Sequence, residues 1–188
     1  MSVKYWEYFL SLEDDLERCT KYVEFSPKNY AAYSNEFAKI IMSASSEFEN
    51  VAKDLCHLIS PGSNPLNIEN IYPILLGAYP KFGTVEVAIL RYKITFKPWE
   101  DWTPTKRPDW WSKGYNKIKH SRTQSFEMAN LNNAILSMAG LFVAILYYHH
   151  RASGGINIDF NRSPTLFDIV DTGLLSGASF TVSYDIPV

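Results

Sequence analysis

Two long segments of the chain place apolar residues at the three- and four-residue spacing of an α-helix. In residues 29–59 these side chains form one continuous stripe, which indicates a helix with one face against a core. Residues 126–151 begin with polar turns and become apolar on nearly every side from Ala134, which indicates a helix enclosed by its neighbours. We therefore expect the fold to be organised around these two helices.

Three shorter helices are predicted beside the long ones. The first covers residues 12–24, with Ser11 as a suitable N-cap, and the second covers 67–79. A third is expected over 109–121, where Asp109 can cap the first turn.

The remaining periodic segments have the two-residue alternation of β-strands. Residues 84–96 predict one half-buried strand over a helical layer. After the glycine pair at 154–155, short segments at 156–160, 166–170 and 179–186 predict small strands or an extended wrap. This C-terminal arm could pair with the 84–96 strand or with another subunit.

A chain of 188 residues can bury a substantial core within one domain. The predicted class is mainly α, of the α+β type: an antiparallel helical bundle built on two long helices, with a small β-sheet and an extended C-terminal arm. We expect a single domain over 1–188, with a helical core at 29–152, a strand insertion at 84–96 and the arm at 153–188.

Charge is spread unevenly along the chain. The net charge of −2 predicts no general attraction to nucleic acid or to an anionic membrane. Residues 106–122, however, carry six cations and one anion, a local charge of +5, so that the rest of the chain carries −7. Any attraction to phosphate should therefore be local to this segment.

Other features of the composition exclude several classes of protein. The longest apolar run, 134–148, has 15 residues, whereas a bilayer requires roughly 20. The N-terminus has no signal-peptide pattern, Cys19 and Cys56 cannot make a disulfide framework, and no Cys or His pair has metal-ligand spacing. We expect a cytoplasmic protein with reduced thiols, without a membrane partner, a cofactor or a bound metal.

A loop rich in proline and tryptophan is predicted at 97–109, followed directly by Trp110 and Trp111. Its tryptophans could form a ligand cage or a platform for stacked bases. The interpretation we favour is that they cover one end of the hydrophobic core.

The basic segment has the residue types of a phosphate-binding site. Asn116 and His120 are four residues apart and share one face of the expected helix. An imidazole can act as general acid or base near neutral pH, and cations can stabilise charge on a phosphorane-like group. The alternative is a histidine packed against the tryptophans, with lysines that only solvate the surface. The cations around this face are Lys113, Lys117, Lys119 and Arg122.

Glu47 lies at the edge of the apolar stripe of the first long helix. A carboxylate there needs a partner if it is buried. It is either a solvated boundary residue, which we favour, or a residue that meets the basic segment around His120.

The segment Tyr115-Asn116-Lys117-Ile118-Lys119-His120-Ser121-Arg122, placed before a long apolar helix and after an earlier one that carries Glu47, resembles the HEPN superfamily. That family consists of small helical bundles, many of them metal-independent RNases of bacterial toxin–antitoxin and antiphage defence systems. Its motif is an Arg, usually followed by a polar residue such as Asn, with a His four to six residues after the Arg. Asn116 and His120 match the Asn and the His, whereas Tyr115 stands at the position of the Arg.

The resemblance implies a homodimer in which two such segments face each other across a cleft. The small residues between Ala134 and Ala144 are then the expected interface. Members of the family that lack the full motif serve as binding or regulatory partners.

Two functions are therefore open: an endoribonuclease, or a non-catalytic assembly or regulatory module that binds a protein or a nucleic acid. Binding of a small ligand among the tryptophans is a third, weaker hypothesis. For the endoribonuclease we expect His120 as acid or base, Asn116 to orient the substrate and Arg122 to hold phosphate. The predicted substrate contacts are Lys113, Lys117, Lys119, Tyr115 and Glu47.

Overall fold

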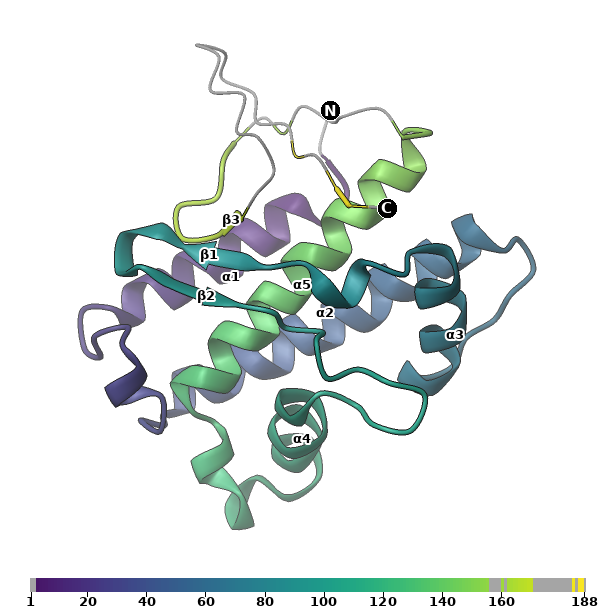
Figure 1. Ribbon diagram of the computed structural model, residues 1–188. Coiled ribbons are helices and arrows are strands. Elements are labelled where there is room, and N and C mark those ends of the chain that lie inside the picture. The colour runs from purple at the N-terminus through teal and green to yellow at the C-terminus, as the bar shows by residue number, and fades with distance from the viewer. Residues whose placement is uncertain (1–2, 156–159, 161, 171–183, 185, 188) are drawn as a thin grey trace.

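The computed structural model describes residues 3–155, 160, 162–170, 184 and 186–187. These residues confirm the predicted mainly α, α+β class, because α-helices make up most of the regular structure and are combined with one small antiparallel sheet (Figure 1). The α-helices are α1 (Trp6–Cys19), α2 (Asn35–Ile59), α3 (Ile68–Ala78), α4 (Asn116–Ser121) and α5 (Leu131–Ala152).

The two long helices, α2 and α5, pack along each other and run in the same direction. At their starts, Tyr33 and Asn130 form a β-bridge. At their ends, the Arg151 Nε donates a hydrogen bond to the Leu58 carbonyl oxygen at 3.2 Å. The prediction of an antiparallel bundle is therefore wrong for this pair, because residues 60–130 carry the chain back to the end at which α2 begins.

Helix α1 runs antiparallel to both long helices. Its first residues lie beside the end of α5, where the ring of the buried His149 contacts the Lys4 carbonyl oxygen through Nε2 at 2.8 Å. The predicted start at residue 12 is wrong, because helical spacing of buried residues already begins at Trp6 and continues through Phe9 to Leu16. Ser11 is thus inside the helix and caps nothing.

Side-chain caps define the starts of the two long helices. The Ser34 Oγ accepts a hydrogen bond from the Phe37 amide at 3.1 Å, and the Asn130 Oδ1 accepts one from the Asn133 amide at 3.0 Å. The residues before each cap pair with one another instead of continuing the helix, so α2 begins at 35 rather than 29 and α5 at 131 rather than 126.

The sheet has the order β2-β1-β3 and is antiparallel throughout. The single strand predicted at 84–96 is in fact a hairpin, in which a 3₁₀ turn and Lys93, with φ of 55°, join two strands. Pairing of the C-terminal arm with this region is confirmed, because Ile169 pairs with Val87. The strands predicted at 156–160 and 179–186 fall mainly outside the described residues. The strands are β1 (Val87–Ile89), β2 (Ile94–Phe96) and β3 (Asp168–Ile169).

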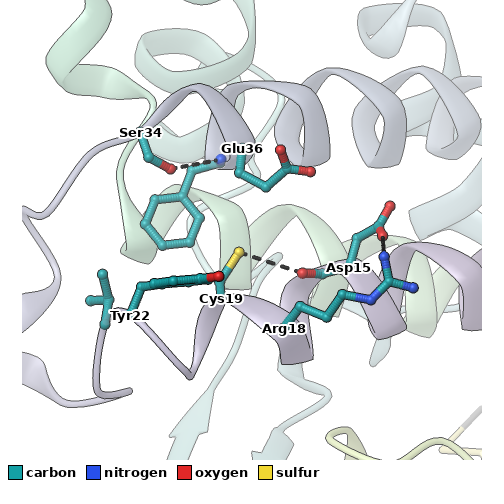
Figure 2. A pocket seen from close by; sticks show the side chains of 8 residues that line it. Asp15, Arg18, Cys19, Tyr22, Ser34 and Glu36 are labelled. Atoms are coloured by element: carbon teal, nitrogen blue, oxygen red, sulfur yellow. Dashed lines mark hydrogen bonds and ion pairs between the residues drawn. The ribbon is translucent and has the colours of Figure 1, made fainter.

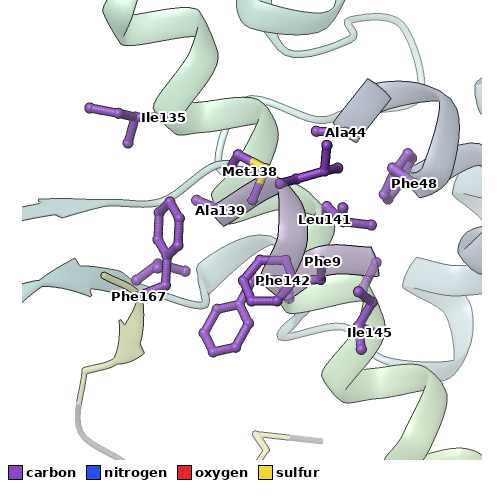
Figure 3. Packing of buried hydrophobic residues seen from close by; sticks show 14 of the residues in the cluster. Phe9, Ala44, Phe48, Ile135, Met138, Ala139, Leu141, Phe142, Ile145 and Phe167 are labelled. Carbon is purple, nitrogen blue, oxygen red and sulfur yellow. The ribbon is translucent and has the colours of Figure 1, made fainter. Parts of the chain in front are cut away.

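A buried glutamate attaches the arm to α1. The Glu13 carboxylate accepts hydrogen bonds from the amides of Thr165, Leu166 and Phe167 at 2.8, 2.9 and 3.1 Å. Burial raises the pKa of Glu13, and these donors offset part of that rise. The Phe167 ring lies among the core aromatics near Phe142, as Figure 3 shows.

The tryptophan-rich loop covers α5, so the structural interpretation of these residues is confirmed. Trp99, Trp102, Trp110 and Trp111 are all buried. The Trp99 Nε1 donates to the Gly140 carbonyl oxygen at 3.2 Å, and the rings of Trp99 and Trp110 rest on the glycine itself.

This packing overturns the predicted dimer interface. Ala134, Ala139, Gly140 and Ala144 are buried within the single chain and offer no surface to a second copy. Helix α5 is long and apolar enough to cross a membrane, yet 83% of its most apolar window is buried inside the protein. Burial in the protein core therefore accounts for the apolar composition of α5.

Replacing Gly140 tests the contact with the tryptophans. A Cβ there would lie 3.0 Å from ring carbons of both Trp99 and Trp110, whereas a Cβ at the exposed Gly77 of α3 would meet nothing. Each glycine-to-alanine change gains roughly 1 kcal/mol of helix propensity, but overpacking at the buried site costs about 1–3 kcal/mol. In urea unfolding, we expect Gly140→Ala to be less stable than Gly77→Ala by the overpacking cost of about 1–3 kcal/mol. Equal stabilities of the two variants would contradict the packing described.

Replacing Glu13 tests the attachment of the arm. Glu13→Gln keeps the shape but loses one acceptor oxygen, which leaves a buried amide unsatisfied and should cost about 1–3 kcal/mol. Asp14→Asn is the matched control, since among the described residues Asp14 is engaged in a surface ion pair with Arg162 at 3.1 Å. Its loss should cost at most about 1 kcal/mol. Thermal unfolding of both variants measures the difference. A Glu13→Gln variant as stable as wild type would show that the hydrogen bonds from Glu13 to the arm contribute nothing to stability.

Candidate nucleic-acid interface

A π-helical turn over Trp110–Tyr115 leads directly into α4. Such turns are rare and frequently lie at functional sites. The predicted N-cap at Asp109 is wrong: its side chain makes no cap hydrogen bond and instead pairs with the Lys113 Nζ at 2.8 Å.

One face of this segment is fixed in the core. Trp111, Tyr115 and Ile118 are buried, and the rings of Trp111 and Tyr115 meet edge to face with centroids 4.8 Å apart. Gly114 lets the segment approach α5 closely, because a Cβ there would lie 3.0 Å from the side-chain nitrogen Nδ2 of Asn133. The rotation of α4 about its axis is thereby determined.

The opposite face of α4 contains the predicted site and is open to solvent. His120, Lys117 and Arg122 are exposed, and Asn116, one turn before His120, is half-buried. Within the described part of the chain, the side chains of these four residues form no hydrogen bond or ion pair. The alternative of a histidine packed against the tryptophans is therefore excluded.

Other predicted cations already have partners. Lys113 is in the exposed ion pair with Asp109, a type of interaction that is worth little in water. The Lys119 Nζ lies 3.2 Å from the Tyr115 Oη and over the same ring, and this hydrogen bond is the main cause of the raised pKa of Lys119. Lys117 and Arg122 are thus the cations that remain free for a ligand.

Among the described residues, the Glu47 side chain forms no hydrogen bond or ion pair with the basic segment, which was the less favoured of its two interpretations. Its carboxylate accepts a hydrogen bond from the Asn50 Nδ2 at 3.1 Å, in line with the favoured boundary interpretation. A different carboxylate of α2, Glu49, lies close enough for its charge to contribute to the raised pKa of Lys119. The spacing along α2 could not identify Glu49, because that choice depends on where α4 lies.

Tyr115, the residue at the motif-arginine position, is only 2% exposed. Its ring belongs to the core, so its predicted role as a substrate contact is wrong for the ring, and only its hydroxyl reaches the surface lysine Lys119. The site consequently lacks a cation at that position.

An exposed aromatic residue, which falls within the helix predicted at 29–59, lies near the site. The Tyr33 side chain is 55% exposed, and its ring meets the Phe126 ring edge to face at a centroid distance of 5.4 Å. Phe126 opens the 3₁₀ turn Phe126–Met128, which packs against α4.

A separate cavity of about 470 Å³ lies between α1 and α2, with Tyr22 beside Cys19 and the carboxylate of Glu36 at its rim (Figure 2). The Glu36 and Asp15 carboxylates are engaged by Lys39 and Arg18, at 2.8 and 2.9 Å. Burial, with these carboxylates nearby, raises the pKa of Cys19 to about 11, which disfavours the thiolate form at neutral pH. The carboxylates of this cavity thus already have cationic partners, unlike the cations Lys117 and Arg122 of the α4 surface.

Comparison with protein-family models, with curated proteins and with solved structures finds no match to this chain. Among the described residues, no group of three or more His, Cys, Asp or Glu side chains could hold a metal ion.

Substitution of Tyr115 tests whether this position can accommodate the motif arginine. Tyr115→Arg would bury a guanidinium beside Trp111 without a carboxylate partner, at a cost of about 3 kcal/mol or more. Tyr115→Phe keeps the ring and should cost no more than about 1.5 kcal/mol for the lost hydrogen bond to Lys119. Chemical denaturation of both variants decides this, and an arginine variant as stable as wild type would mean that the position can open to the surface.

Proposed function

We propose that this chain is an RNA-directed protein of the HEPN type, in which the outer face of α4 binds the RNA backbone and His120 transfers protons during metal-independent cleavage. The observation that carries the proposal is the exposed imidazole of His120, one helical turn from Asn116 and flanked by the free cations Lys117 and Arg122. The resemblance of residues 115–122 to the family motif supports it. The free cations favour a polyanionic ligand, since they have no carboxylate to satisfy them.

The reaction requires only the groups that this surface offers together with a second acid or base. The ribose 2′-oxygen attacks the adjacent phosphorus, the bond from phosphorus to the 5′-oxygen breaks, and a 2′,3′-cyclic phosphate and a 5′-hydroxyl result. A neutral imidazole accepts the 2′-hydroxyl proton, and a protonated group supplies one to the leaving 5′-oxygen. In the homodimer that the resemblance implies, the His120 of the two copies would share these roles.

The neighbouring residues have separate tasks in this scheme. Lys117 and Arg122 stabilise the additional negative charge that develops on the phosphoryl oxygens. Asn116, through its amide, orients the phosphate or the ribose relative to His120. Lys113 and Lys119, which already have partners, attract the RNA more weakly.

Burial of Tyr115 favours a second candidate function, a module that binds RNA or a regulatory partner without cleaving it. A HEPN-type active site uses the motif arginine as a principal cation, and here that position faces the core. The same α4 surface would then hold the phosphates, and only the chemical step would be missing.

Cleavage of a mixed pool of structured and unstructured RNA in the presence of EDTA tests the proposal. Loss of a general acid or base typically costs about 10²- to 10⁴-fold in rate, so His120→Ala should abolish measurable cleavage. His57→Ala is the matched control, because His57 is also an exposed histidine, on α2, and we expect it to cleave like wild type.

Binding measured alongside cleavage separates the two candidate functions. For electrostatic binding to single strands, log affinity falls linearly with log salt. The steepness of that fall should decrease by roughly 0.7 for each of Lys117→Ala and Arg122→Ala. Salt-dependent binding without cleavage would select the binding module. A folded protein that neither binds nor cleaves RNA would contradict both.

A further inference from the structure

We infer that Tyr33, supported by Phe126, is a stacking platform for an unpaired base next to the phosphate-binding face of α4, so that the ligand is single-stranded RNA or an RNA loop. This inference rests on the proposed function and adds the substrate class to it.

The Tyr33 ring is held in place although it is largely exposed. Its backbone lies in a short pairing between the entries to the two long helices: the Ser34 amide donates to the Ala129 carbonyl at 3.1 Å, and the Leu131 amide donates to the Ala32 carbonyl at 2.9 Å. The edge-to-face contact with Phe126 supports the ring from the side. Little conformational freedom therefore remains to be lost when a ligand binds.

The platform lies at the same end of the molecule as the free cations. Phe126 follows Arg122 by four residues and belongs to the turn that packs against α4. In Figure 1, α4 lies at the end of the bundle where α5 begins, and the bridge between Tyr33 and Asn130 places Tyr33 at that same end. A backbone held by Lys117 and Arg122 can thus direct one of its bases toward Tyr33.

Exposed aromatic rings beside unpaired cations match the chemistry of single-stranded nucleic acid, in which each nucleotide has a flat base and a phosphate. Bases within a duplex are already stacked and cannot use such a ring. The exposed Tyr22 lines a cavity that it shares with the carboxylates of Asp15 and Glu36, a setting that disfavours a phosphate. The observations therefore favour an unpaired base at Tyr33 over the other exposed tyrosines.

Binding of two oligonucleotides of about twelve units tests the inference by fluorescence anisotropy. Both carry 2′-O-methyl groups, which remove the nucleophile and prevent cleavage; one has bases and the other is abasic. Stacking on an aromatic side chain is typically worth about 5- to 100-fold in affinity. We expect Tyr33→Ala to weaken binding of the base-bearing strand by that factor and to leave binding of the abasic strand unchanged.

Further variants control for structure and for general surface effects. Tyr33→Trp should bind at least as well as wild type, whereas Tyr33→Leu, which still covers Phe126 but has no flat face, should be as weak as Tyr33→Ala. Tyr8→Ala should have no effect, since Tyr8 is also a partly exposed tyrosine (46%) but lies on α1. Unchanged melting temperatures would show that the Tyr33 variants fold.

The outcomes distinguish this inference from the proposed function. If wild type binds both strands equally and Tyr33→Ala changes neither, the phosphate-binding function stands and the platform is overturned. If wild type binds neither strand, the proposed function fails and the inference fails with it. Equal affinity for a duplex of the same length would also overturn the single-strand specificity.

Discussion

The fold depends on the need to cover α5 on all sides within one chain. A helix that is apolar around its whole circumference cannot leave a face in water without losing much of the free energy gained by burial. Here α2 and α1 cover two sides, the aromatic residues of the C-terminal arm a third, and the tryptophan-rich loop the side at Gly140. Helix α3, by contrast, packs against α2.

The candidate site follows from the same constraint. Trp110 and Trp111 are drawn into the core over α5, and Tyr115 continues their buried face into α4. Once that face is fixed, the helical period leaves Asn116 and His120 on the outer side. The exposed chemistry of α4 is thus a consequence of the anchoring of its inner side, and no interaction among the polar residues themselves is required to position them.

Periodicity alone was enough to predict the two long helices, the mainly α class and the common face of Asn116 and His120, because each depends on local spacing. The direction of α5 relative to α2 was beyond such reasoning, since it depends on the path of residues 60–130. The small residues of α5 were expected to meet a second copy, yet they meet the protein's own tryptophans: an apolar face indicates that something covers it, without indicating what.

The same limit applies to the site. Spacing could place Tyr115 next to Asn116 but could not show that its ring enters the core. It also could not show that Glu49, rather than Glu47, is the carboxylate whose charge reaches Lys119. The exposure of the Tyr33 side chain could not be predicted from spacing either. It fits the apolar stripe of α2 in the sequence, but the helix begins after it, at Asn35.

The parallel direction of α2 and α5 has an electrostatic consequence. Each helix has a partial positive charge of roughly half a unit at its N-terminus, and in an antiparallel pair these fields would largely cancel. Here both N-termini lie at one end of the molecule, the end beside α4, so the backbone dipoles of the two longest helices add there. The positive potential that these two dipoles add at this end is built into the peptide groups and would persist even if individual lysines were replaced.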